Sequence, residues 1–241
     1  MSDRQERPER ALEWVSDGTR LVLAGLARLD DDALDGPTLL PSWSRRYLLS
    51  HLANNAGALR NLLYWARTGE ERRMYLSSEQ RAADIEAGAT APAASLRALV
   101  DSSASALWSD LDAMPARAWS AEVITAQGLT RQASEVAWMR SREVYIHGVD
   151  LDAGLSFADL PASFLTALLD DIASRRSAVG SCPALQLTAT DTGGTWQVRG
   201  ATAPVSVSAS VAALAQWLSG RPGGDLTDTA GEPVPDLPAW L

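Results

Sequence analysis

Apolar residues recur at every third or fourth position in four long segments of the first 150 residues, which is the spacing of one face of an α-helix. In the first segment, residues 9–30, these positions are Leu12, Val15, Val22, Leu26 and Leu29. The others run from Ser42 or Ser44 to about Thr68, from Pro92 to Pro115, and from about Gln132 to Asp150, and a shorter helix is expected at 78–87. Helices with one apolar face bury it by packing together, so the sequence predicts an antiparallel four-helix bundle over residues 1–153.

The pattern changes after Gly154. Residues 160–179 are again typical of a helix, but 185–189 and 196–198 alternate apolar and polar residues around a turn at 191–194, which predicts a hairpin. A third short strand at 205–208 and a helix at 211–219, capped by Ser210, follow. The fold expected is therefore mainly α, with a small α+β domain over residues 154–241.

The formal net charge of −9 disfavours nucleic acid and anionic membrane surfaces as partners. No apolar run is long enough for a transmembrane helix. The segment Met1 to Arg7 is charged and no apolar stretch follows it, so we expect a cytoplasmic protein, and we expect a monomer. Cys182 is the single cysteine, so no intrachain disulfide can form and any thiol chemistry would take its thiol from outside the chain.

His51 and His147 are the only histidines, and both fall in predicted bundle helices. Glu143 lies four residues before His147, so the two side chains share one face of a helix. If His51 meets them inside the bundle, the three form a divalent metal site with an open position, which suits zinc. The alternative is a surface pair of Glu143 and His147 with a buried, hydrogen-bonded His51.

Arginines are the second group of candidate functional residues, because a guanidinium binds a carboxylate through two hydrogen bonds. Arg140 and Arg142 flank Glu143, and Arg81 follows Ser78-Glu79-Gln80 in the short helix expected at 78–87. Arg221 lies in a Gly- and Pro-rich loop after the last helix, where a side chain can reach a site between domains. For each of them the simpler interpretation is a solvated surface residue.

Four stretches of the sequence form a recognisable pattern: 39–55 (LLPSWSR through HLANN), 65–71 (WARTGEE) with Met74-Tyr75, 125–128 (TAQG) and, most specifically, 138–147 (WMRSREVYIH). Together they resemble the mycothiol-dependent maleylpyruvate isomerase family. The resemblance implies a DinB-like four-helix bundle followed by a small α/β domain. It also implies zinc held by His51, Glu143 and His147, a catalytic arginine at Arg221, and a contact from Arg81 to substrate or cofactor.

The resemblance further implies a reaction, the conversion of maleylpyruvate to fumarylpyruvate in gentisate breakdown. The thiolate of mycothiol, at the zinc site, would add to the double bond, the resulting single bond would rotate, and elimination would leave the trans isomer. The substrate is a small dicarboxylate. Two alternatives stay open: another mycothiol-dependent S-transferase on the same scaffold, and a non-catalytic helical module that binds a metal.

Overall fold

The computed structural model describes residues 7–180 and 182–238, and the chain divides into two compact units, Met1–Leu155 and Ser156–Leu241. Each unit is described by itself. The sequence placed the change after residue 153, whereas the structure places it after Leu155. Leu155 belongs to the first unit because its side chain packs beside Gly148, where an added Cβ would lie 3.3 Å from Leu155 Cδ2.

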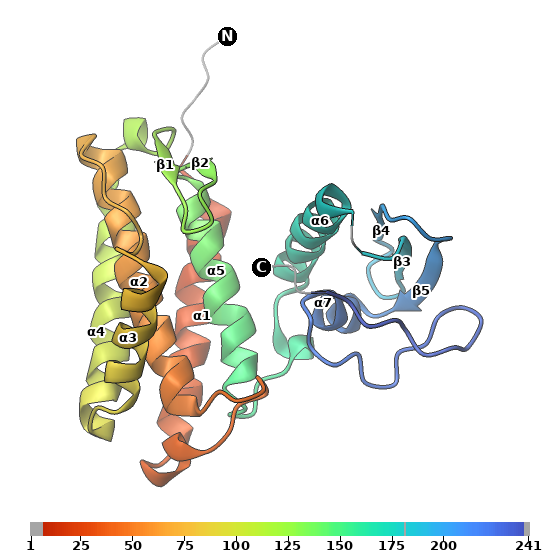
Figure 1. The fold of residues 1–241 in the computed structure, drawn as a ribbon, viewed down its shortest axis with the longest axis horizontal. Helices are drawn as coiled ribbons and strands as arrows, with labels where there is room; N and C mark the ends of the chain where they lie inside the picture. The colour runs from red at the N-terminus through yellow and green to blue at the C-terminus, as the bar shows by residue number, and fades with distance from the viewer. Residues whose placement is uncertain (1–6, 181, 239–241) are drawn as a thin grey trace. The chain divides into compact units, whose positions relative to one another are not determined.

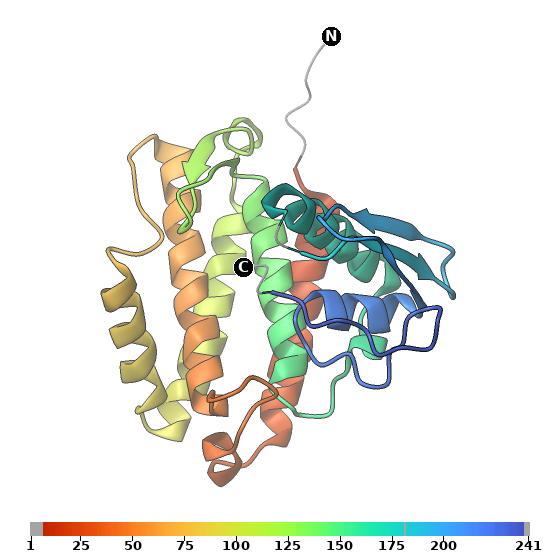
Figure 2. The same cartoon turned by 45° about the vertical axis from the view of Figure 1, so that its right-hand side comes forward.

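The first unit is a bundle of four long helices that lie side by side in Figures 1 and 2. They are α1 (Glu9–Arg28), α2 (Arg45–Thr68), α4 (Ala93–Asp112) and α5 (Glu135–Asp150), and a shorter helix, α3 (Ser78–Ala89), packs against α2. The predicted segments match these helices to within a few residues at each end.

The antiparallel neighbours in the bundle are α1 with α4 and α2 with α5. Arg97 at the start of α4 donates from Nη1 to the carbonyl of Leu26 near the end of α1, at 2.9 Å. Arg45 at the start of α2 donates from Nε to the carbonyl of Leu151, just past the end of α5, at 2.9 Å. The other two neighbouring pairs, α1 with α5 and α2 with α4, are parallel, because the chain returns along the bundle through residues 69–92 before α4 begins.

A small antiparallel hairpin, β1 (Glu122–Ile124) with β2 (Thr130–Gln132), lies between α4 and α5 in the chain. Gly128, between the two strands, has a φ of +75°, and the strands themselves were not predicted from the sequence. Strands of three residues are too short for an alternating pattern to reveal them.

Two large apolar clusters fill the bundle, one towards each end. Between them lies a small cluster of Val22, Leu52 and Val144. His51 precedes Leu52 and Glu143 precedes Val144, so the packing of these two apolar residues fixes both polar side chains at mid-height of the bundle.

Helix α2, which carries His51, has a defined start and end. The hydroxyl of Ser44 accepts a hydrogen bond from the backbone N–H of Tyr47 at 3.2 Å. At the other end Gly69 adopts a left-handed φ of +79° and donates to the carbonyl of Trp65 at 2.8 Å. This conformation favours glycine, as the sequence predicted for the position after Thr68.

Replacing Ser44 with alanine should lower the free energy of unfolding by about 1 kcal/mol, because the first turn of α2 loses its side-chain acceptor. Chemical denaturation measures the change. Ser102→Ala is the matched control, since that hydroxyl is exposed and bonds only to Leu99 of its own helix. An equal loss of stability in both variants would contradict the capping role.

The second unit holds a three-stranded sheet and two helices. Its elements are α6 (Ala162–Val179), β3 (Leu185–Ala189), β4 (Thr195–Val198), β5 (Val205–Ala209) and α7 (Val211–Leu218). Strand β3 is central, antiparallel to β4 and parallel to β5. The predicted hairpin, third strand and Ser210 cap are all present. Residues 239–241 of the predicted tail lie outside the described residues.

Cys182 is a buried residue of the second unit, 3% exposed. Burial raises the pKa of its thiol, although nearby Arg176 acts in the opposite direction. A buried thiol of raised pKa is a poor nucleophile, which agrees with the expectation that it is idle. Among the helices of the described residues, none combines the length and apolar character needed to cross a membrane.

Candidate metal centre

His51 of α2 meets Glu143 and His147 of α5 inside the bundle. One ligand atom from each of the three residues lies within 4.8 Å of the others. Glu143 Oε2 is 2.9 Å from His51 Nε2 and 3.4 Å from His147 Nε2. The i,i+4 spacing aligns Glu143 and His147 on one face of α5, and the neighbouring α2 brings in His51. Two imidazoles and one carboxylate at this separation fit the donor set of a zinc-type ion with a position left open.

The protonation states of His51 and Glu143 favour cation binding. Burial lowers the pKa of His51, even though Glu143 beside it acts to raise it, so the imidazole is neutral at neutral pH. Burial alone would raise the pKa of Glu143, but His51, His147 and Arg140 outweigh it and hold that pKa well below its usual range. Neutral imidazole and ionised carboxylate are the forms that bind a metal.

Asp150, the last residue of α5, orients His147. It is fully buried, and its Oδ2 lies 2.8 Å from His147 Nδ1. When Nδ1 is protonated, its N–H donates a hydrogen bond to this carboxylate, and the lone pair of Nε2 can then bind a cation. Asp150 was not predicted from the sequence, although an acidic residue three positions after His147 lies on the same helix face and indicates a hydrogen-bond partner for the imidazole.

Replacing Asp150 with asparagine should weaken metal binding by roughly 10–100-fold, the usual cost of losing the group behind a histidine ligand. Competition with a chromophoric chelator measures the affinity. Asp101→Asn is the control, because Asp101 lies on the exposed face of α4. Equal affinity in the two variants would show that Asp150 does not support His147.

The ring of Trp43 packs against both histidines. Its ring stacks on His147 with centroids 6.1 Å apart and planes 21° apart, and meets His51 edge to face at 5.4 Å and 71°. Packing by a large ring restricts rotation of both imidazoles. No role was predicted for Trp43 from the sequence, because its contact with His147 on α5 joins residues that lie far apart in the chain.

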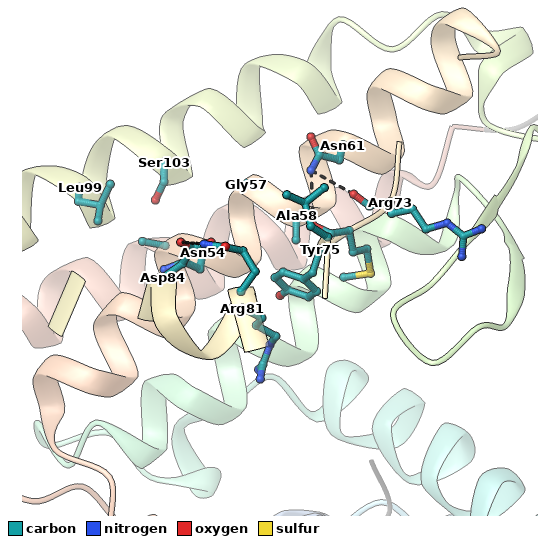
Figure 3. Close-up of a pocket in the computed structure, with 14 residues that line it drawn as sticks. Asn54, Gly57, Ala58, Asn61, Arg73, Tyr75, Arg81, Asp84, Leu99 and Ser103 are labelled. Atoms are coloured by element: carbon teal, nitrogen blue, oxygen red, sulfur yellow. Dashed lines mark hydrogen bonds between the residues drawn. The ribbon is translucent and has the colours of Figure 1, made fainter. Parts of the chain in front are cut away.

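Arg81 lies next to the triad and beside a pocket of about 390 Å³. Its Nη2 is 3.3 Å from His51 Nδ1, and its guanidinium carbon is 5.4 Å from the ring centroid of Tyr75. Figure 3 shows Arg81 and Tyr75 next to each other at the pocket. The polar part of the lining consists of Asn54, Asn61, Arg73, Tyr75, Gln80, Arg81, Asp84 and Ser103. A cation and several hydrogen-bonding groups therefore adjoin the triad.

Arg140 is buried, at 3% exposure, so the expectation of a solvated surface residue was wrong for it. It precedes Glu143 by three residues and His147 by seven, so it shares their helix face and points towards α2. There Nη1 donates to the carbonyl of Leu52 and to Asn55 Oδ1, both at 2.8 Å. Burial lowers the pKa of Arg140 to about 10, which leaves it charged at neutral pH.

Arg221 lies in the second unit, in the loop after α7, where its Nη1 donates to the carbonyl of Ser219 at 2.7 Å. The three candidate ligands and Arg81 belong to the first unit. The structure thus brings His51, Glu143, His147 and Arg81 together, and the catalytic role of Arg221 stays a prediction.

Comparison with known proteins adds a second line of evidence. A sequence model described as the mycothiol maleylpyruvate isomerase N-terminal domain matches residues 5–152. Two solved structures are similar to the chain: crystal structures of the mycothiol-dependent maleylpyruvate isomerase and of a variant of it with a histidine changed to alanine. Each is 37% identical, with 97% of both chains covered and a TM-score of 0.92. A comparison with curated proteins gave no match.

Proposed function

Since the chain belongs to the mycothiol-dependent maleylpyruvate isomerase family, we propose that it isomerises maleylpyruvate to fumarylpyruvate with mycothiol as its thiol cofactor. The structural observation that supports this proposal is the convergence of His51, Glu143 and His147 beside a pocket that Arg81 lines. The proposal places the reaction in gentisate breakdown. A reaction that depends on a free thiol requires a reducing compartment, which supports a cytoplasmic location.

The donor set supports a resident divalent metal, with zinc the ion that two imidazoles and a carboxylate suit. The ligands would be His51, Glu143 and His147. When bound, such a metal and mycothiol would together supply a thiolate at neutral pH, the nucleophile that lowers the order of a carbon–carbon double bond. Asp150 and Trp43 hold the imidazoles in place for this task.

Arg81 has a separate role in the proposal, as a carboxylate-binding group. In the described structure Nη2 of Arg81 faces His51 Nδ1, which must then accept the hydrogen bond. A histidine that binds a cation through Nε2 carries its ring proton on Nδ1, so it cannot also accept from a guanidinium. A loaded centre therefore leaves Arg81 available to an anion in the adjoining pocket. Arg221 is proposed as a second guanidinium that binds a carboxylate and stabilises the charge that develops during the reaction.

One experiment tests the proposal as a whole. Elemental analysis of the purified protein should find about one divalent metal per chain, and the ultraviolet spectrum should report maleylpyruvate conversion only when mycothiol is added. A second arm offers mycothiol and a simple electrophile in place of maleylpyruvate. Turnover without any thiol would overturn the proposal. Conjugation of the electrophile with no isomerisation would instead identify an S-transferase.

A further inference from the structure

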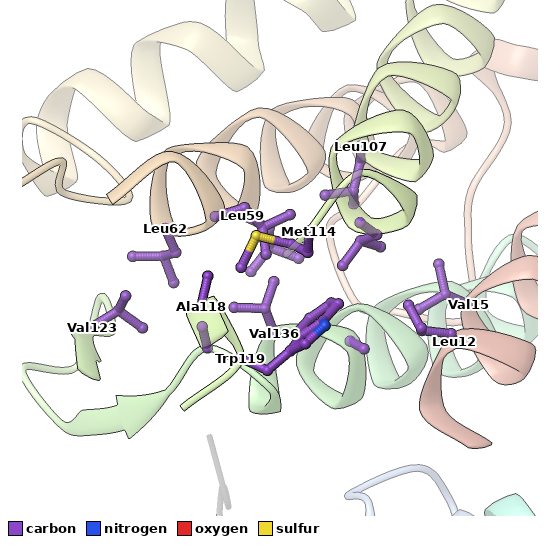
Figure 4. Packing of buried hydrophobic residues seen from close by; sticks show 14 of the residues in the cluster. Leu12, Val15, Leu59, Leu62, Leu107, Met114, Ala118, Trp119, Val123 and Val136 are labelled. Atoms are coloured by element: carbon purple, nitrogen blue, oxygen red, sulfur yellow. The ribbon is translucent and has the colours of Figure 1, made fainter. Parts of the chain in front are cut away.

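A second cavity, of about 330 Å³, opens between α1 and α4, and it shares no lining residue with the pocket beside Arg81. Its walls are partly apolar and include the buried Val15 of α1 and Leu107 of α4, and Figure 4 shows both among the packed residues of the core. Hydroxyl groups come from Ser16, Thr19, Ser105 and Ser109. Arg140 of α5 also lines this groove.

Arg140 brings a buried positive charge to the groove. Two of its hydrogen bonds go to neutral oxygens of α2, and its buried Nε has no hydrogen-bond partner among the described residues. No carboxylate of the described chain forms an ion pair with it. The charge of Glu143 favours the protonated form of Arg140, but the Glu143 carboxylate lies against both histidines. A buried guanidinium whose hydrogen bonds go to neutral oxygens interacts strongly with an anion that reaches it.

The rest of the groove restricts which anion fits. Trp108 lies at its rim, 38% exposed, and offers an aromatic surface next to Leu23 and Ala104. The neighbouring hollow shares Ser16 and Trp108 with the groove, and its charged lining residues, Arg7, Glu9, Glu13 and Asp17, include an ion pair of Arg7 with Glu9 at 3.4 Å. Arg140 is the one cationic residue that lines the groove in the described part of the chain, so the groove offers a partner to a single carboxylate.

We propose that the groove between α1 and α4 is a binding site for a small organic monocarboxylate, with its carboxylate towards Arg140 and its aromatic or apolar body along Trp108. This site goes beyond the proposed function, because it uses neither the candidate metal ligands nor the pocket beside Arg81. Its single guanidinium fits one carboxylate, whereas the substrate class expected at the metal centre carries two.

Benzoate is the probe and benzamide its neutral counterpart, with binding to the full-length protein measured by calorimetry. We expect benzoate to bind at one site and benzamide at least tenfold more weakly. Ala104→Phe fills the groove and should weaken benzoate binding at least tenfold. Ser102→Phe, on the exposed face of the same helix, should leave it unchanged. Ser105→Phe, at the exposed rim, is the second blocking variant if Ala104→Phe does not fold.

The Arg81→Ala variant distinguishes benzoate binding in the groove from benzoate binding at the metal centre. Benzoate binding that persists in Arg81→Ala and disappears in the groove-filling variants supports the proposal, whether or not the isomerase assay succeeds. Binding lost in Arg81→Ala and retained when the groove is filled would assign benzoate to the metal centre and overturn it. Equal binding of benzoate and benzamide would overturn it too, since Arg140 would then contribute nothing.

Discussion

Replacing His51 with alanine should leave the protein folded but without its metal and without measurable isomerase turnover. Of the three proposed ligands only His51 comes from α2, so its loss leaves Glu143 and His147 on a single helix face. Two donors hold a divalent ion far more weakly than three. The loss in kcat/KM should therefore exceed the roughly 10–100-fold typical of removing a residue behind a ligand. Metal content by elemental analysis and the mycothiol-dependent assay measure the two effects.

Ser50→Ala is the matched control for this variant. Ser50 neighbours His51 on α2 and is equally buried, but its hydroxyl donates to the carbonyl of Ile85 on α3, at 2.7 Å. Its loss costs a buried hydrogen bond and leaves the imidazole in place, so metal content should stay near one ion per chain. If His51→Ala keeps its metal and its activity, the ligand assignment is wrong.

Helices were the part of the fold that the sequence predicted well. The spacing of Leu12, Val15, Val22 and Leu26 reflects one buried face of α1, and all four residues are buried. Local signals also gave the ends of α2, because a serine cap and a left-handed glycine act within a few residues. The parallel pairing of α2 with α4 has no such local signal, since it depends on how residues 69–92 return along the bundle.

The candidate site also has a part that the sequence could predict and a part that it could not. Glu143 and His147 could be paired from their spacing. His51 lies 92 residues from Glu143, and its place beside the pair was predicted only from the family resemblance and from the cost of burying a carboxylate. Arg140 shows why other residues near the site could not be placed from the sequence. Its interior position depends on acceptors at Leu52 and Asn55, which lie 88 and 85 residues away in the chain. General exposure statistics for arginine carry no information about such contacts.

Replacing Arg221 with alanine should lower kcat/KM while leaving the metal in place. Removing a guanidinium that pairs with a buried carboxylate costs about 2–4 kcal/mol, or about 30- to 1,000-fold in kcat/KM. Arg221→Lys should recover part of this loss, because the charge returns without the two-pronged hydrogen bonding. Retained metal distinguishes this variant from His51→Ala, in which metal and activity disappear together.

Arg199→Ala is the control for Arg221, because Arg199 is an exposed arginine of the same unit. Both variants remove one positive charge, so a general change in the field around this acidic protein affects them equally. A loss confined to Arg221→Ala therefore reports a specific contact with the substrate. Equal, small effects in both variants would remove Arg221 from the catalytic machinery and leave Arg81 as the guanidinium assigned to the substrate carboxylate.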